Sequence, residues 1–170
     1  MTLDGWRRFP DLGLDWYPAD LHAHLDTHFI ADIETNLRRF HERPWTFIHQ
    51  DYELDNVIFR DAGPVILDWQ TAMRSFPGID LSWTLACSHN DATLEREPEL
   101  LDHYRAELAG AGGPAWSAEE LLDDLAWGAF YWASVGPVTV LNTWEAGPSD
   151  RGAQRFLKML RGSIDGAVRW

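Results

Sequence analysis

Hydrophobic residues recur every three or four positions from Asp20 to Pro44, which is the spacing of one buried face of a helix. The residues on that face are Leu21, Leu25, Phe29, Ile33, Leu37 and Phe40. Because proline cannot continue a helix, we expect the helix to end before Pro44. Residues 1–17, by contrast, are punctuated by Trp, Pro and Gly without a regular period, so we expect an irregular lead-in there.

A different pattern follows the proline, in which short apolar runs alternate with polar turns. The runs WTFIH (45–49), NVIFR (56–60) and PVILDW (64–69) have the length and composition of strands. The tripeptide DAG (61–63) between the last two is a turn. Residues 56–69 therefore predict a β-hairpin with polar groups at both ends.

After the hairpin the pattern becomes helical and stays so. We expect helices over residues 80–89, from about Pro98 to the glycines at 110–113, from Ser117 onward, and over residues 149–170. Ser117 and Glu120 have the spacing of a capping box, whereas Gly136-Pro137 should interrupt the helix that they begin. The predicted fold class is α+β, mainly α, with a small β-hairpin and about six helices.

Composition narrows the kinds of protein that remain. A length of 170 residues with 45% apolar content fits one folded domain, residues 1–170. The single cysteine, Cys87, excludes an internal disulfide and a Cys-based zinc site. A net charge of −13 argues against a nucleic-acid surface. No apolar run approaches the roughly 20 residues that cross a bilayer and no secretory signal is visible, so we expect a cytoplasmic protein with no membrane partner.

Residues that carry chemistry gather in one short stretch, FIHQDYELDNVIF (47–59). Here His49, Asp51 and Asn56 stand between two apolar runs, where polar groups are costly unless they have partners or a task. The hairpin then folds back, so Asn56 at its start and Asp68 at its end should come close in space. Carboxylate and amide oxygens suit Mg²⁺. In phosphoryl transfer one Asp accepts the substrate proton while an Asn and a second Asp hold the metal, and the stretch predicts that chemistry.

The segments HQDYELDNVIF, VILDWQ and PGIDLSWTL resemble the C-terminal lobe of the aminoglycoside phosphotransferase-like kinases. This group, which has the protein-kinase fold, also includes choline kinases and ecdysteroid-kinase-like proteins. The resemblance is closest over residues 47–86 and implies ATP or GTP as donor, Mg²⁺ as metal and a small-molecule hydroxyl as acceptor. The roles it implies are Asp51 as catalytic base, His49 as a brace of the catalytic loop, Asn56 and Asp68 as Mg²⁺ ligands, Asp80 as a structural acid, and Ile58 and Leu67 beneath the adenine ring.

Some features depart from the family pattern. Gln50 stands where the family has a small Gly, which could crowd the loop, and Trp69-Gln70 follow the metal-binding Asp. No Gly-rich strand-turn-strand precedes His49, and the one lysine, Lys158, lies far downstream. The resemblance therefore implies a catalytic lobe whose N-terminal lobe is absent. The chain would be a fragment, a subunit completed by a separate N-terminal lobe or partner chain, or a catalytically inactive lobe that serves as a binding module.

A histidine-rich segment, DLHAHLDTH (20–28), offers a rival site. Its D-x-H-x-H pattern, with His22 and His24, resembles the first metal motif of amidohydrolases. A barrel of that class needs about 250 residues, and the periodicity here is helical, so a metal-dependent hydrolase is the remoter alternative. On a helix, His24 and His28 would lie one turn apart with Asp32 below, which suits zinc. A solvated helix face is the plainer interpretation.

Aromatic residues on the later helices offer an acceptor pocket by the same resemblance. They are Trp127, Phe130, Tyr131, Trp132 and Trp144. Together with the nearby acids Asp123, Asp124 and Glu145, they would hold a cationic acceptor through cation–π and charge contacts. Aromatic residues at helical spacing more often form core, so the acceptor stays open among aminoglycoside, choline-like, sugar and steroid hydroxyls.

Overall fold

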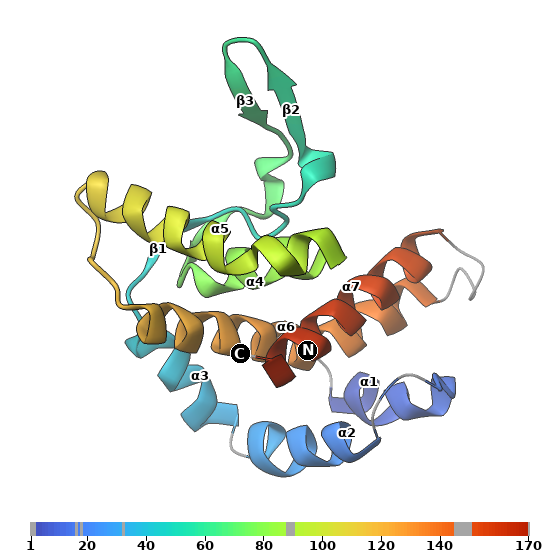
Figure 1. The fold of residues 1–170 in the computed structure, drawn as a ribbon. Helices are drawn as coiled ribbons and strands as arrows, with labels where there is room; N and C mark the ends of the chain where they lie inside the picture. Colours follow the sequence, from blue (N-terminus) through green and yellow to red (C-terminus); the bar gives the residue numbers. More distant parts are fainter. Residues whose placement is uncertain are drawn as a thin grey trace.

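The computed structural model describes residues 3–15, 17, 19–31, 33–87, 91–144 and 151–169. Within these ranges seven α-helices accompany four short strands, in agreement with a mainly helical α+β protein. Figure 1 shows the helices forming the body of the molecule, with the β2–β3 hairpin projecting away from it. Of the helices described, none combines the length and the apolar character required to span a bilayer.

The first residues are more regular than their sequence suggested. Leu3–Arg8 form helix α1 and Phe9–Leu12 form a 3-10 turn, instead of the expected irregular lead-in. The side chains of Trp6 and Phe9 are completely buried, and Nε1 of Trp6 donates a hydrogen bond to Oδ1 of Asp26 at 3.0 Å. A helix of this length is not stable alone, so burial of the two aromatic rings is what orders it.

The single helix expected over residues 20–43 is divided. Helix α2 spans Ala19–Leu25, a π-helical turn spans Asp26–Ile30, and helix α3 spans Ile33–Glu42. The π turn adds one residue to a helical turn, a local change that a three-to-four-residue hydrophobic period does not reveal. Of the predicted hydrophobic face, Leu25 and Phe40 are buried and Leu21 packs against the core, whereas Leu37 is exposed. The side chains of Phe29 and Ile33 lie outside the described residues, and the predicted continuity of the helix was wrong.

The strands form two antiparallel pairs. β1 (Thr46–Ile48) pairs with β4 (Met73–Ser75), and β2 (Val57–Arg60) pairs with β3 (Gly63–Ile66). Over the described residues these remain separate two-stranded sheets. The β2–β3 hairpin was expected from the sequence, whereas β4 was not, because three residues are too few to show an alternation. The β1–β4 pair brings both ends of the hairpin segment back to the helical body.

Four further helices complete the described fold: α4 (Gly78–Cys87), α5 (Asp91–Gly110), α6 (Ala118–Trp144) and α7 (Arg151–Arg169). Helix α5 begins before Pro98, and α6 continues through Gly136-Pro137, so the expected interruption was wrong. A Cβ at residue 136 would lie 2.7 Å from Cδ1 of Leu160. The glycine therefore lets α7 pack closely against α6 instead of ending the helix.

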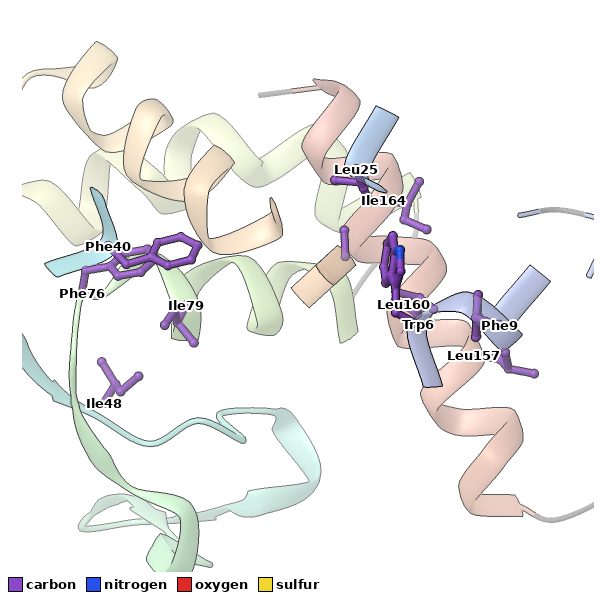
Figure 2. Close-up of a cluster of buried hydrophobic side chains, with 11 residues drawn as sticks. Trp6, Phe9, Leu25, Phe40, Ile48, Phe76, Ile79, Leu157, Leu160 and Ile164 are labelled. Carbon is purple, nitrogen blue, oxygen red and sulfur yellow. The ribbon is translucent and has the colours of Figure 1, made fainter. Parts of the chain in front are cut away.

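The buried side chains tie the site-bearing segments to this body (Figure 2). Phe40 stacks on Phe76 with ring centroids 5.4 Å apart, and Ile48 and Ile79 belong to the same core. A second part of the core joins α1 and the 3-10 turn after it to α7 through Trp6, Phe9, Leu157, Leu160 and Ile164. Because Ile48 is the last residue of β1, its burial fixes the point at which the following loop, which carries the candidate chemistry, leaves the sheet.

Candidate active site

A carboxylate on α4 holds the loop that follows β1. Oδ2 of Asp80 accepts a hydrogen bond from the backbone N–H of His49 at 2.6 Å, and Oδ1 accepts one from Gln50 at 2.7 Å. Burial raises the pKa of Asp80, and the two backbone N–H groups oppose that shift. Hydrogen bonds from backbone donors to a carboxylate are among the stronger ones in proteins. Asp80 therefore sets the path of the loop at its entry.

His49 connects the loop to the end of the hairpin. Its ring is buried, with Nε2 2.7 Å from the carbonyl oxygen of Leu67 and Nδ1 3.3 Å from the backbone nitrogen of Asp51. A backbone N–H can only donate, so Nδ1 accepts and Nε2 carries the proton that it donates to Leu67. This arrangement is that of a neutral imidazole with both nitrogens engaged. His49 acts as a spacer, and neither nitrogen is left to take a substrate proton.

Asp51 lies beside Asn56, as the sequence pattern required for a shared site. Nδ2 of Asn56 donates to the backbone oxygen of Asp51 at 2.8 Å and to its Oδ2 at 3.0 Å. From α4, Nε1 of Trp83 donates to Oδ1 of Asp51 at 3.3 Å. Each carboxylate oxygen thus has a donor, which fixes the orientation of the side chain. Oδ1 of Asn56 has no hydrogen-bond donor among the described residues.

Asp68 follows directly after the hairpin and is exposed. The hairpin closes with a hydrogen bond of 2.8 Å from the backbone N–H of Leu67 to the carbonyl oxygen of Asn56, so Asp68 is one residue from the partner of Asn56. Its backbone is left-handed, with φ 59° and ψ 54°, which costs an L-residue about 1 kcal/mol. In the part of the chain described, its carboxylate makes no hydrogen bond or ion pair.

The oxygen atoms of Asn56 and Asp68 fit a hard cation. Oδ1 of Asn56 and the carboxylate of Asp68 are both without partners from the described residues, and both are oxygen donors. No cluster of three or more His, Cys, Asp or Glu side chains suited to a metal occurs in the described ranges. Mg²⁺ is held by one or two carboxylates, with water and phosphate oxygens completing its coordination. The residues present suit Mg²⁺ better than a transition metal.

The apolar residues predicted to lie beneath an adenine ring are open to solvent. Ile58 is 39% and Leu67 40% exposed, and Ile58 lies opposite Val65 in the hairpin. Other large side chains on or beside the strands are also exposed: Trp45, Phe47, Leu54, Phe59, Val65, Trp69 and Met73. We call these nine residues the exposed strand residues. Large exposed apolar side chains that lie close together mark protein interaction sites or ligand-binding grooves.

Gln50 does not crowd the loop. Its backbone φ is 68°, a conformation that glycine adopts without strain, which gives a physical reason for the glycine that the family resemblance implies here. The side chain leaves the loop toward α6, where Nε2 lies 3.2 Å from the hydroxyl oxygen of Tyr131. Burial raises the pKa of that hydroxyl. The departure from the family pattern is therefore accommodated by a contact with α6.

The acids and aromatic residues expected at a cationic acceptor pocket are engaged by an arginine of the chain itself. Nε of Arg43 lies 3.1 Å from Oδ1 of Asp124, and Nη1 donates to Oδ2 of Asp123 at 3.0 Å. The same guanidinium lies 5.5 Å from the ring centroid of Trp127. Arg43 thus fills the place that we expected a cationic acceptor to take. The side chains of Trp144 and Glu145 lie outside the described residues.

The remaining aromatic residues of that group contribute to the packing. Nε1 of Trp132 donates to the carbonyl oxygen of Ile79 at 2.9 Å, and its ring lies 4.1 Å from that of Trp83. Phe130 packs against the buried core. Trp132 therefore supports the residue that contacts Asp51, which is a different role from the one that the sequence suggested.

The histidine-rich segment forms helix α2, not the end of a strand. His22 stacks on Trp6 with ring centroids 4.2 Å apart, and its Nδ1 lies 3.0 Å from the hydroxyl oxygen of Tyr17. The rings of His24 and His28 lie 4.4 Å apart, while Asp32 falls outside the described residues. His22 belongs to the packing of the N-terminal helices, so the structure lends no support to a hydrolase that uses it as a metal ligand.

Two residues near Asp51 were missed from the sequence. Trp83 follows Asp80 by three positions on α4, and residues three apart share a helix face, so it could have been found once Asp80 was placed. Arg155 on α7 contacts Glu53 and Asp55 within the loop. About a hundred residues separate the two partners, and no local pattern signals the contact.

Comparison with known proteins agrees with these features. The model of the phosphotransferase enzyme family matches residues 2–122. A relative, the N-acetylmuramate/N-acetylglucosamine kinase of Caulobacter vibrioides, is 31% identical over 105 residues, which is 56% of this chain and 29% of the relative. This chain thus spans less than a third of that kinase, and no solved structure matches it significantly. Because the family match covers most of the chain and includes the loop, the hairpin and Asp80, the chain belongs to the phosphotransferase enzyme family.

Proposed function

We propose that this chain carries the catalytic part of a small-molecule kinase that transfers the γ-phosphoryl group of ATP or GTP to a hydroxyl. One observation carries the proposal: the Asn56 amide holds the Asp51 carboxylate at the base of the hairpin that leads to Asp68. Family membership supports phosphoryl transfer in general. The contact between Asn56 and Asp51 supports this loop as the site of phosphoryl transfer, because it groups a proton acceptor with oxygen ligands for a metal.

In the proposed reaction Asp51 accepts the proton of the acceptor hydroxyl. Trp83 and Asn56 hold its two carboxylate oxygens in place, so little reorientation is needed when the substrate arrives. His49 keeps the backbone of Asp51 in position through Nδ1. Asp80 holds the entry of the same loop through two backbone N–H groups.

Asn56 would serve two sites at once. Its Nδ2 orients Asp51, and its Oδ1 together with Asp68 would hold Mg²⁺. A bound Mg²⁺ would neutralise the negative charge of the nucleotide phosphates. A single amide therefore links the orientation of the proton acceptor to occupancy of the metal site. Replacing Asn56 by aspartate would keep an oxygen ligand but lose the donor that orients Asp51.

The exposed strand residues support a second part of the site. We propose that Ile58 and Leu67 lie under the nucleotide base and that a separate N-terminal lobe or partner chain covers the hairpin. A two-stranded hairpin is marginally stable alone, and Phe59 is 73% exposed. The phosphate-binding lysine of such kinases would come with this covering part, because the one lysine of the chain, Lys158, lies on α7.

A sugar hydroxyl is the acceptor that we propose first. The relative that shares 31% identity is named as a kinase of N-acetylmuramate and N-acetylglucosamine. Arg43 engages Asp123, Asp124 and Trp127, which weakens the argument for a cationic acceptor there. A neutral or acidic amino sugar therefore fits the observations better than an aminoglycoside or choline.

A catalytically inactive lobe that only binds a ligand or partner is the second candidate. The observation that favours it is that no lysine precedes the loop, so the chain alone lacks the usual phosphate-pairing cation. The two candidates differ in their need for Asp51. A kinase requires its carboxylate, whereas a binding module does not.

The test is transfer of the γ-phosphoryl group from Mg·ATP to N-acetylglucosamine and to N-acetylmuramate. We expect Asp51→Asn to lower the rate by about 10²-fold or more, as for loss of a general base, while the protein stays folded. Asp61→Asn, an exposed acid in the hairpin turn, is the matched control and should leave the rate unchanged. Equal rates for Asp51→Asn and wild type would contradict the proposal. Nucleotide binding without any transfer would favour the binding module.

A further inference from the structure

Helix α7 lies beyond the residues that the family model matches, yet it reaches the loop that carries Asp51. Nη2 of Arg155 donates to Oε1 of Glu53 and, at 3.1 Å, to Oδ2 of Asp55. Glu53 and Asp55 both lie between Asp51 and Asn56 in the sequence. One nitrogen of one arginine thus bridges two carboxylates within the proposed catalytic loop.

The contact with Glu53 is shielded from solvent on one side, because the carboxylate is buried while the Arg155 side chain is 47% exposed. Glu53 is 8% exposed, and a buried carboxylate is costly unless it is paired. Among the residues described, Arg155 is the cation with which Glu53 forms an ion pair. Without Arg155, the buried carboxylate of Glu53 would have no ion-pair partner among the described residues, which favours a change in the path of the loop.

The clamp closes the turn that presents Asn56. Residues Leu54–Asn56 form a 3-10 turn, and the backbone N–H of Asn56 donates to the carbonyl oxygen of Glu53 at 3.0 Å. Arg155 holds the side chains at the start of this turn and immediately before its end. The position of the Asn56 side-chain amide, which orients Asp51, therefore depends on a contact from α7.

A second contact from α7 approaches Asp51 from another direction. Phe156 packs near Trp83, with ring centroids 6.4 Å apart, and Trp83 donates to Asp51. The positive charge of Arg155 also faces three acids of the loop, because Glu53, Asp55 and Asp51 all raise its pKa. Consecutive residues of α7 thus support the loop through charge and through packing.

We propose that Arg155 is a positioning residue of the phosphotransfer loop, clamping Glu53 and Asp55 so that Asn56 is held in register with Asp51. The inference rests on the proposed function for its consequence, but the clamp itself is testable without any ligand. It assigns to the last helix, outside the family match, a part in forming the site. Arg155 is not a catalytic residue, because it contacts Asp51 only through the loop.

The first test compares backbone hydrogen exchange in wild type and Arg155→Met, a variant that keeps an apolar stem and loses the charge. We expect hydrogen exchange at the backbone N–H of Asn56 to become faster by about tenfold or more, through local opening of the loop. The amides of His49 and Gln50 should change by less than about twofold, because Asp80 holds them independently of α7. An equal change at all three amides, or none, would overturn the proposal.

Two variants serve as controls. Arg155→Lys keeps the charge on a shorter side chain and should restore part of the protection of the Asn56 amide. Arg96→Met removes an exposed arginine that pairs with Glu99 on α5 and should leave all three amides as in wild type. Protection that is lost equally in Arg155→Lys and Arg155→Met would contradict this expectation, because a positive charge at this position would then not stabilise the loop. Loss in Arg96→Met would show a nonspecific effect and overturn the proposal.

The second test asks whether the clamp matters for ligand binding. Titration with Mg·ATP should give an affinity at least about tenfold weaker for Arg155→Met than for wild type, at a temperature where both are folded. A lower melting temperature with unchanged affinity would mean that Arg155 is structural only, which overturns the positioning role. If wild type itself binds no nucleotide, the proposed function fails for the isolated chain, and the exchange result still decides on the clamp.

Discussion

The loop of residues 49–56 and the hairpin of residues 57–66 belong to one candidate site, but they are stabilised in opposite ways. In the loop, the side chains of His49, Asp51 and Asn56 all hydrogen-bond within the chain. In the hairpin, the large apolar side chains point to solvent, and Figure 1 shows the strands standing clear of the helices.

This difference separates two requirements of the proposed reaction. Proton transfer needs a carboxylate held in one orientation, and the chain supplies all of the contacts that hold Asp51. Tight nucleotide binding also uses a covered apolar surface and the phosphate-pairing lysine of such kinases. The apolar side chains of the hairpin are exposed and the one lysine lies on α7, so we expect the chain alone to bind Mg·ATP weakly, through the metal site. The comparison therefore predicts that substitutions of residues that support the loop lower the stability of the protein strongly. Substitutions of exposed apolar residues on the hairpin should change it little.

Among the substitutions at the loop and its supports, Asp80→Asn should have the largest effect on stability. Asparagine has one acceptor oxygen, so its amide N–H₂ would face one of the two backbone N–H groups of His49 and Gln50. We expect the free energy of unfolding to fall by about 2–4 kcal/mol, as for a buried donor left unsatisfied beside a lost charged hydrogen bond. Urea unfolding measures it, with Asp61→Asn as the control that should stay within about 0.5 kcal/mol. A small effect of Asp80→Asn would mean that the loop has another anchor.

The buried carboxylate of Asp124 should make the stability of the folded protein depend on pH. Its Oδ2 accepts from the backbone N–H of Gly78 at the start of α4, and burial raises its pKa to about 6. The folded state therefore binds this proton more tightly than the unfolded state, and its contribution to stability is lost as pH rises from about 4 through 6. We expect the stability of wild type relative to Asp124→Asn to fall by about 2 kcal/mol across that range. Parallel pH profiles of the two proteins would contradict this.

Two substitutions at Gln50 can separate the effect of backbone strain on stability from the effect of the contact with Tyr131. Gln50→Gly and Gln50→Ala both lose the side-chain hydrogen bond, but only glycine adopts a φ of 68° without strain. We expect the glycine variant to be more stable than the alanine variant by about 1 kcal/mol. Thermal unfolding of the pair measures this difference directly. Equal stabilities would mean that the loop relaxes to another backbone conformation.

Phe59 should show the smallest effect. Phe59→Ala on the hairpin should change the free energy of unfolding by no more than about 0.5 kcal/mol, because the ring is already exposed. The same substitution at Phe76, which is completely buried, should cost about 3–5 kcal/mol. A cost at Phe59 that approaches the cost at Phe76 would show that the hairpin folds onto the body of the isolated protein.

The sequence predicted those parts of the site that depend on neighbouring residues. The proximity of Asp51 and Asn56 follows from five residues of loop, and the hairpin follows from two strand-like runs around a turn. The capping box is also local: Ser117 and Glu120 exchange hydrogen bonds of 2.7 and 3.1 Å. Each of these features is fixed by chain geometry over a short distance.

Features that depend on distant residues were not predictable from one sequence. The pairing of β1 with β4 joins Thr46 to Ser75, and the clamp joins Glu53 to Arg155. The sequence predicts a helix break at Gly136 because the packing partner of that glycine, Leu160, is not adjacent in the sequence. In each case tertiary packing overrides a local preference, and local preferences were all that the sequence offered.

The measurement that tests the central claim most directly is a calorimetric titration of the chain with Mg·ATP. Asp68→Asn should abolish saturable binding, because Asp68 is the carboxylate proposed to hold the metal, while Asp61→Asn on the same hairpin should bind as wild type does. Saturable binding that is lost only in Asp68→Asn would support a metal-nucleotide site at the base of the hairpin. Equal binding by wild type and Asp68→Asn would contradict the account.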